Sequence, residues 1–422
     1  MARLIYSVLF YLLLPLIILR LLFRGLKSSG YRSRWAERFG LVASTADKRI
    51  IWLHAVSVGE TLAAAPLVRA LQEQYPQHRL LVTCMTPTGS ERIQAVFGDS
   101  VEHCYAPYDM PDALSRFLAT VNPEILIIME TELWPNTIAA CHRRNIPVVL
   151  ANARLSQKSA LGYSRVKPLV KPMLESMTAV VAQHHDDGAR FIDLGLPGSV
   201  LSISGNIKFD LTLDAPLKQY AQQLGTQWRG AEGRLIWLAA STHRGEDEII
   251  LQAMSQIKAG MEVPPLLVLV PRHPERFDQV AELCTSAGYT LARHSKADAT
   301  AGVDILLGDT MGELMAFYGA CDIAFVGGSL VPTGGHNMIE PAAWGVPILT
   351  GPHLFNFAEA SRLLLEAEAM QVCDNADTLA LHCIELLNNQ QQRQTMGDAG
   401  LNVAEDNRGA LDRLLAVIAN SL

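Results

Sequence analysis

Short apolar runs alternate with longer amphipathic stretches along most of the chain. In the first half the apolar runs fall at 51–57, 79–85, 124–129, 147–152, 179–183 and 200–206. The stretches between them repeat apolar residues with the period of a helix, as in TLAAAPLVRALQEQY. Continuous β-branched runs without apolar–polar alternation are typical of strands buried on both faces, as in a parallel sheet. The pattern therefore predicts an α/β domain with helices on both faces of its sheet.

The same alternation returns after a lapse across residues 210–233. A second series of apolar runs falls at 234–241, 265–271, 304–309, 322–328 and 346–351. No sequence repeat relates the two halves, so they share only the order of strands and helices. We predict two doubly wound, Rossmann-like domains at 41–210 and 233–422, joined by a linker at 211–232 and facing each other across a cleft. Ligands of such sheets bind beyond the carboxyl ends of the strands.

A different pattern, a nearly unbroken apolar run, precedes the first domain. Residues 4–19 read LIYSVLFYLLLPLIIL, slightly short of the roughly 20 apolar residues that span a bilayer. Basic residues follow, and no small-residue cleavage site does, so a secretory signal is disfavoured. A buried core helix would not need the basic flank. We predict that residues 1–40 are a membrane anchor that spans the bilayer or lies along it, with the body on the cytoplasmic side near anionic lipids.

Composition narrows the class of protein further. The 422 residues are 49% hydrophobic and 18% charged, which is ordinary for an ordered globular protein. The net charge is −7, yet residues 1–40 are basic; a nucleic-acid partner is not expected, because such binders are more often basic throughout. The seven cysteines show no C-x-x-C pair, which argues against a zinc site and fits a reducing compartment. With no D-x-D pair either, we expect no tightly bound metal.

Polar motifs follow the strands of the second half. AASTHRGED brings Ser241 and Thr242 to an expected helix start, with Glu246 as a capping partner. VPRHPERF follows the next run and supplies Arg272, His273 and Arg276, and GDTMGEL follows the one after with Thr310, Met311 and Gly312. Helix N-termini favour anions through their unpaired N–H groups and the macrodipole. A single such end is usually only a cap, but three at one edge of a sheet indicate a phosphate-bearing ligand.

The stretch GGSLVPTGGHNMIEP, from residue 327 to 341, carries paired glycines that allow a close backbone approach. Two interpretations stay open. Asn337 caps a helix that begins near residue 338, with Glu340 as a box-like partner. Alternatively, the amides of Gly335, His336 and Asn337 face a phosphate while Glu340 holds two ribose hydroxyls. In the second domain of a paired wound fold, the latter suggests a nucleotide-sugar donor.

Charged residues follow the strands of the first half. SVGE places Glu60 on a glycine-containing turn at a helix start. It is either a first-turn acid favoured by the dipole or a carboxylate kept ionised to accept a hydroxyl proton. METELWPN adds Glu130 and Glu132, and GNIKFD adds Lys208, a cation suited to a leaving phosphate.

Together the motifs SVGE, TPTGSER, METELWPN, GNIKFD, STHRGE, PRHPERF, GDTMGEL and FVGGSLVPTGGHN resemble the 3-deoxy-D-manno-octulosonic acid (Kdo) transferase family of lipopolysaccharide synthesis, over essentially the whole chain. The resemblance implies an inverting GT-B glycosyltransferase at the cytoplasmic face of the inner membrane. Its donor would be CMP-Kdo and its acceptor the lipid A precursor lipid IVA, with two Kdo residues added. By the same resemblance Glu60 is the general base, and Glu130 and Lys208 stabilise the transition state. The implied CMP-binding residues are Pro271, Arg272, Thr310, Met311, Gly312, Gly335, His336, Asn337 and Glu340.

Other functions stay open at this point. A GT-B enzyme that uses a UDP-sugar on another lipid differs little in its residues, and competition between CMP and UDP would separate the two. A nucleotide-sugar epimerase of the same architecture would not need the N-terminal anchor. A non-catalytic membrane scaffold would not need acids and Lys208 at three strand ends.

Overall fold

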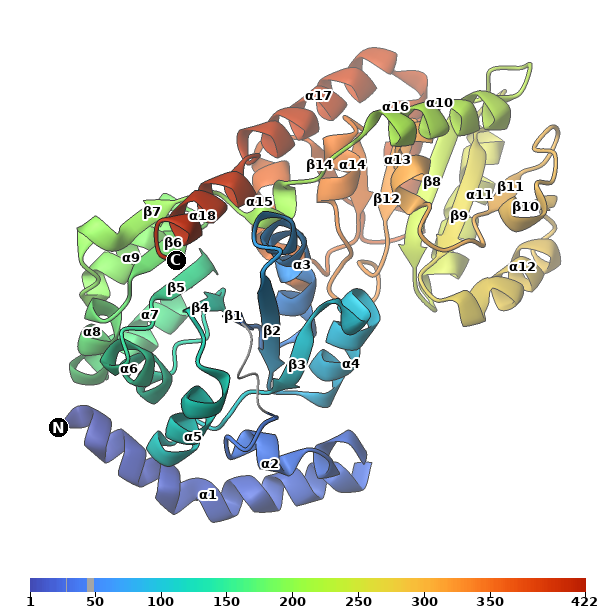
Figure 1. Ribbon diagram of the computed structural model, residues 1–422. Coiled ribbons are helices and arrows are strands. Elements are labelled where there is room, and N and C mark those ends of the chain that lie inside the picture. The colour runs from blue at the N-terminus through green and yellow to red at the C-terminus, as the bar shows by residue number, and fades with distance from the viewer. Residues whose placement is uncertain (28, 44–48) are drawn as a thin grey trace. The chain divides into compact units, whose positions relative to one another are not determined.

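The computed structural model describes residues 1–27, 29–43 and 49–422. They form two units, each built on a seven-stranded parallel sheet with helices on both faces (Figure 1). The first unit is Met1–Asp210 with Arg408–Leu422, and the second is Leu211–Asn407. Residues 28 and 44–48, which fall in the predicted basic flank and at the start of the predicted first domain, lie outside the described residues. The prediction of two doubly wound parallel-sheet domains is confirmed.

The first sheet has the strand order β3-β2-β1-β4-β5-β6-β7. Its strands are β1 (Arg49–His54), β2 (His78–Cys84), β3 (Glu102–Tyr105), β4 (Ile125–Met129), β5 (Val148–Ala153), β6 (Ala179–Ala182) and β7 (Leu201–Ile203). Trp52 of β1 pairs with Leu81 on one side and Leu126 on the other. The winding direction reverses between β1 and β4, which is where ligands bind in sheets of this kind.

Helices cover both faces of the first sheet. They are α1 (Ala2–Lys27), α2 (Trp35–Arg38), α3 (Val58–Gln74), α4 (Pro87–Phe97), α5 (Pro111–Val121), α6 (Pro135–Arg143), α7 (Gln157–Ser164), α8 (Lys167–Glu175), α9 (His185–Leu194) and α18 (Ala410–Ala419). Successive residues of a strand point to opposite faces. Trp52 therefore packs with α5, α6, α8 and α9, while Leu53 packs with α3, α4 and α18.

The second sheet has the order β10-β11-β9-β8-β12-β13-β14. Its strands are β8 (Ile236–Thr242), β9 (Leu266–Pro271), β10 (Leu291–Arg293), β11 (Ile305–Leu307), β12 (Ile323–Val326), β13 (Ile348–Thr350) and β14 (Met370–Val372). Its helices are α10 (Ala215–Arg229), α11 (Glu246–Gly260), α12 (Phe277–Ser286), α13 (Leu314–Ala320), α14 (Ile339–Ala343), α15 (Ala358–Glu366), α16 (Ala376–Asn388) and α17 (Gln390–Asp406). Here the winding reverses between β8 and β12.

The apolar pattern missed three strands, and all three lie at sheet edges. β3, β10 and β14 end the two strand orders and are only partly buried. Edge strands are short and carry polar side chains because one of their sides has no neighbouring strand. A search for continuous apolar runs therefore does not find them.

The structure corrects two of the predicted domain boundaries. The predicted linker contains α10, whose Leu224 and Trp228 are buried in the core of the second unit. At the other end, α18 belongs to the first unit, where Leu414 is buried in the core and the Arg413 guanidinium donates to the Ser204 carbonyl at 2.6 and 2.9 Å. Both helices are amphipathic, and each is placed by the core that buries its apolar face.

The apolar N-terminal run forms α1, which lies along the first unit beside α5 and α2 (Figure 1). One stripe of α1, with Phe10, Leu14, Ile17 and Leu21, packs on Tyr108 and its neighbours. Most of its other apolar side chains are exposed. Residues Ala2–Leu26 have the length and mean hydropathy, 2.3, of a helix that can cross a membrane, and 11% of that segment is buried in the protein. This weakly suggests membrane association.

Candidate active site

Glu60 lies at the start of α3, directly after β1 and beside the point where the first sheet reverses. The Ser57 side chain caps the helix by accepting from the Glu60 amide at 3.3 Å. The Ser57 hydroxyl in turn donates to Glu60 Oε1 at 2.9 Å, and the Val56 amide donates to Oε2 at 2.8 Å. These reciprocal bonds fix the carboxylate on the turn. The S-V-G-E motif is therefore an N-cap turn built around an almost fully buried acid, which is 8% exposed.

Burial raises the pKa of Glu60 to about 7, more than its two hydrogen bonds lower it. Glu132 and Glu130 lie close enough to raise the pKa of Glu60 further. Burial thus works against the predicted ionised state of this carboxylate. A carboxyl group with a pKa near neutrality is suited to accept a proton at physiological pH.

Glu130 and Lys208 form an ion pair at the same edge of the first sheet. Glu130 follows β4, has a φ of 56° and donates its amide to the Ala151 carbonyl at 2.9 Å. Lys208 Nζ lies 3.4 Å from Glu130 Oε1. The Asn206 side chain accepts from the Lys208 amide at 3.1 Å and so shapes the short turn Ile207–Phe209. The structure therefore brings the predicted residues Glu60, Glu130 and Lys208 together.

In the second unit, a cluster of cations and imidazoles lies where the sheet reverses between β8 and β12. The His243 and His336 rings are stacked, with their Nε2 atoms 2.8 Å apart. Burial, His243 and Arg272 lower the pKa of His336 to about 4, and burial lowers the pKa of His243. Both rings are therefore neutral at pH 7, and one donates to the other. The ring of His273 lies edge-on to His243, with centroids 5.4 Å apart.

Glu340, Asn337 and Arg272 lie together beside this cluster. Asn337 Nδ2 donates to Glu340 Oε1 at 3.0 Å, and the charge of Arg272 lowers the pKa of Glu340. Burial nevertheless raises the pKa of Glu340 to about 7. The Asn337 side chain also accepts from the Ile339 amide at 3.2 Å, so it supports the start of α14. Arg272, His336, Asn337 and Glu340 thus form one polar site, as their positions after β9 and β12 predicted.

The glycine loop, residues 327–337, differs from its prediction in one respect. The Gly335 amide donates to the Gly328 carbonyl at 2.7 Å, and the His336 amide donates to the Gly327 carbonyl at 3.1 Å. These two amides are used within the loop, so the prediction that they face a phosphate is wrong. The glycines are needed for close packing: a Cβ on Gly334 would lie 2.4 Å from the Phe355 ring, and one on Gly327 would lie 2.7 Å from the Ser241 carbonyl oxygen.

Glu246 holds the glycine loop in place. Its carboxylate is fully buried and accepts four backbone N–H bonds. Oε2 accepts from His243 at 2.8 Å and Gly328 at 2.7 Å, and Oε1 accepts from Ser329 and Leu330, both at 2.9 Å. From the sequence, Glu246 was predicted only to cap the start of its own helix. Three of its four donors lie more than 80 positions away, so the spacing gave no signal for this role.

The remaining predicted residues of the second unit are placed differently from expectation. Ser241 and Thr242 end β8, and α11 begins only at Glu246, so the prediction that both stand at a helix start is wrong. The Thr242 hydroxyl donates to the buried Asp247 at 2.6 Å, and its carbonyl accepts from the Arg272 amide at 3.0 Å. Thr242 therefore fixes the strand end from which Pro271 and Arg272 emerge.

Thr310, Met311 and Gly312 also precede their helix, because α13 begins at Leu314. Met311 is 59% exposed and Gly312 has a φ of 88°. In this short loop after β11, Thr310 is half-buried and Met311 and Gly312 are exposed; the loop's contact with a ligand stays a prediction.

His243 is a candidate functional residue that the site prediction omitted. It stands in the quoted motif STHRGE, but a single histidine in a polar turn gives no specific signal. Only its stacking on His336 places it in the site. Within residues 1–27, 29–43 and 49–422, no group of three His, Cys, Asp or Glu side chains is placed to hold a metal ion. Activity without a metal stays a prediction.

Comparison with known proteins agrees with this architecture. A family model described as 3-Deoxy-D-manno-octulosonic-acid transferase (kdotransferase) matches residues 33–211. The chain is 46% identical to the 3-deoxy-D-manno-octulosonic acid transferase of Haemophilus influenzae, over 99% of this chain and 98% of that protein. It is 36% identical to the Bordetella pertussis enzyme of the same name, over 100% of both chains. Acinetobacter baumannii MurG aligns with 88% of this chain and 99% of its own at a TM-score of 0.57 and 13% identity, which shows the fold alone.

Two wound units with polar sites at the reversal points of both sheets have the fold of the GT-B class. The identities of 46% and 36% to two 3-deoxy-D-manno-octulosonic acid transferases, over nearly the full length of each, establish the family. The chain belongs to the 3-deoxy-D-manno-octulosonic acid (Kdo) transferase family.

Proposed function

We propose that this Kdo transferase takes Kdo from CMP-β-Kdo and attaches it to lipid IVA, twice in sequence, in lipopolysaccharide core biosynthesis. The acceptor's primary hydroxyl forms a bond to the anomeric carbon of Kdo as the bond from that carbon to the CMP phosphate breaks. The hydroxyl proton goes to Glu60. A single displacement inverts the β-linked donor to an α-linked product.

The chemistry of Kdo assigns a small number of roles to the protein. The anomeric carbon carries a carboxylate and has no neighbouring hydroxyl, so the departure of CMP is strongly dissociative. The enzyme must then stabilise the charge on the departing phosphate and direct one base at the acceptor. Groups that stabilise developing charge typically contribute about 10²–10³ in rate each. Glu60 is the base, and Lys208 with its partner Glu130 stabilises the transition state.

The observation that carries this proposal is the state of Glu60. It lies at the reversal point of the first sheet, its two oxygens are oriented by Ser57 and Val56, and its pKa is raised to about 7. A purely structural first-turn acid would be exposed and ionised, with no need of desolvation. A base is most effective when its pKa lies near the working pH.

The polar site of the second unit supports a nucleotide donor. Arg272 supplies a cation for the phosphate, and Glu340 can accept hydrogen bonds from two ribose hydroxyls. Pro271, Thr310, Met311, Gly312, Asn337 and the ring of His336 complete the CMP site, with Ser241 and Thr242 at the end of β8. Catalysis proceeds without a tightly bound metal, because the donor leaves as a phosphate monoester that protein cations neutralise.

The N-terminal segment supports a place at the membrane. We propose that α1 holds the enzyme on the cytoplasmic face of the inner membrane, where its basic residues meet anionic lipid headgroups. Basic residues at the cytoplasmic end of an apolar segment follow the distribution found in membrane proteins. The donor is a soluble nucleotide sugar and the acceptor a membrane lipid, so both reach the enzyme on that face.

The test is transfer by the purified full-length chain with lipid IVA and either CMP-Kdo or UDP-sugars. We expect a product whose mass is greater than that of lipid IVA by two Kdo residues, formed from CMP-Kdo and inhibited by CMP more strongly than by UDP. A mass increase of one Kdo would correct the number added. Transfer from a UDP-sugar with none from CMP-Kdo would favour the alternative, a GT-B enzyme that acts on another lipid.

A further inference from the structure

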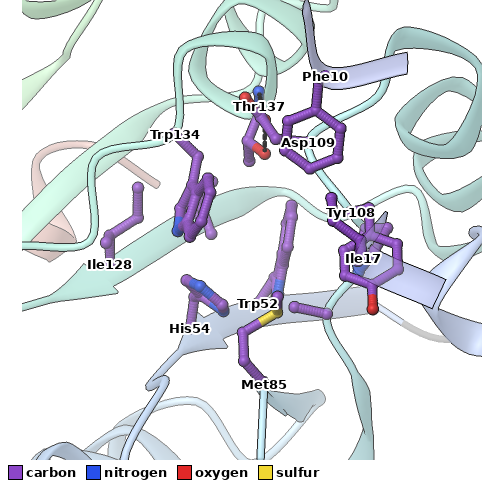
Figure 2. A pocket seen from close by; sticks show the side chains of 13 residues that line it. Phe10, Ile17, Trp52, His54, Met85, Tyr108, Asp109, Ile128, Trp134 and Thr137 are labelled. Atoms are coloured by element: carbon purple, nitrogen blue, oxygen red, sulfur yellow. Dashed lines mark hydrogen bonds between the residues drawn. The ribbon is translucent and has the colours of Figure 1, made fainter. Parts of the chain in front are cut away.

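A cavity of about 220 Å³ lies in the first unit, on the face of the sheet that packs against α5 and α6. Figure 2 shows Trp52 and His54 of β1, Ile128 of β4 and Trp134 around it, with Phe10 and Ile17 of α1 on one side. The cavity is larger than the engineered 150 Å³ cavity that binds benzene. It has room for the end of an alkyl chain.

The polar side chains in the wall are largely engaged with other protein groups. Trp52 Nε1 donates to Thr83 Oγ1 at 2.8 Å, and His54 Nδ1 lies 2.9 Å from the same oxygen. Burial lowers the pKa of His54 to about 4, so the ring is neutral. Asp109 accepts from the amides of Asn136 and Thr137 at 2.9 and 2.7 Å and so caps the start of α6. The wall therefore favours an apolar occupant.

Helix α1 forms one side of the cavity and carries an apolar surface of its own. Phe10 and Ile17 face the cavity, while α1 also carries an exposed row of Leu4, Ile5, Val8, Leu9, Leu12, Leu13, Leu16 and Leu19. The Asn136 side chain donates to Ser7 Oγ at 3.0 Å, which holds the helix against the body. Arg20 and Arg24 follow on the same helix and are exposed. An apolar cavity next to an apolar surface with basic residues fits an acylated anionic lipid.

Two residues of the cavity wall are close neighbours, along the chain, of acids in the candidate active site. Ile128 in its wall precedes Glu130 by two residues, and Trp134 follows Glu132 by two. A chain held there would place the rest of its lipid within reach of the Glu130–Lys208 pair and Glu60. A bulk membrane lipid has no need of such placement, whereas an acceptor does.

We propose that this cavity, the acyl pocket, holds the end of one acyl chain of the lipid acceptor and so positions the acceptor sugar at Glu60. The inference rests on the proposed function, because it takes the acceptor to be an acylated, phosphorylated disaccharide. Binding energy from such a remote chain orients the reacting hydroxyl without touching it.

Filling the pocket tests the proposal. Ala106 lines the acyl pocket and is 4% exposed, so the larger side chain of Ala106→Leu fills part of the pocket. The matched control is Ala119→Leu, at an exposed position on α5. We measure binding of lipid IVA to the full-length chain without any donor, and separately the KM and kcat of transfer. We expect Ala106→Leu to weaken binding of lipid IVA and raise its KM about tenfold or more, the range for a few methylenes in an apolar pocket. The KM for CMP-Kdo should not change.

Two further arms separate the possible causes. With the fully deacylated acceptor, Ala106→Leu and wild type should bind equally; with phospholipid vesicles that lack lipid IVA, they should also bind equally. Unchanged binding of lipid IVA, or equal weakening toward vesicles, would overturn the proposal, the latter in favour of bulk lipid. If Ala106→Leu does not fold, Ile17→Phe fills the pocket from α1. Since binding is measured without donor, failure of CMP-Kdo as a substrate would refute the proposed function and leave this result standing.

Discussion

Replacing Glu246 with glutamine tests how the glycine loop is held. The carboxylate accepts four N–H bonds, two on each oxygen. Glutamine keeps one carbonyl oxygen, which can accept two of them, and its NH₂ group faces the other two donors. Each buried donor left unpaired costs about 1–3 kcal/mol, so the unfolding free energy should fall by roughly 2–6 kcal/mol. Removal of a buried charge relieves some desolvation, which favours the lower end of this range.

The assay is thermal unfolding of the full-length chain, with the KM for CMP-Kdo as a second readout. For a domain of the size of the second unit, each kcal/mol shifts Tm by about 2–4 °C, so we expect a loss of roughly 4–24 °C and a raised donor KM. The matched control is Glu248→Gln, on the exposed side of the same first turn of α11, which should cost at most about 1 kcal/mol. Equal Tm values for the two variants would refute the reasoning.

Three further predictions concern Lys208, Glu60 and activity without a metal. Lys208→Ala should lower kcat by about 10²–10³ while Tm stays near that of wild type; near-wild-type turnover would remove Lys208 from the mechanism. The raised pKa of Glu60 means that the folded state holds its proton more tightly than the unfolded chain, so wild type should lose stability relative to Glu60→Gln as pH rises from about 4.5 to about 7. Parallel stability curves would show that Glu60 is not desolvated. Transfer should survive treatment with a chelator, and loss of activity that a divalent ion restores would show that a metal is required.

Much of the fold was predictable from the sequence because its strands are buried on both faces. Runs such as 124–129 and 322–328 are continuous and apolar, and each coincides with a central strand of one sheet. The prediction placed α10 in the linker and α18 in the second domain, whereas they belong to the second and the first unit. The reason for both errors is physical. Local pattern shows that a helix has an apolar face, but not which of two cores will bury it.

The candidate site was predictable to a similar degree. Glu60, Glu130 and Lys208 were found because charged residues that follow parallel strands, central or at the edge, lie at the same carboxyl end of the sheet. The stacking of His243 on His336 and three of the four bonds of Glu246 join segments more than 80 positions apart, so no local spacing indicates them. The two amides of Gly335 and His336 were predicted to be free because the sequence does not show that the loop folds back on itself.

The rate of Kdo transfer to lipid IVA by Glu60→Gln is the most direct test of the account. Glutamine preserves the size of the side chain and removes its ability to accept the hydroxyl proton. With both substrates saturating, we expect kcat to fall by about 10²–10⁴ while CMP binds as tightly as it does to wild type. Turnover close to that of wild type would contradict the claim that Glu60 is the base.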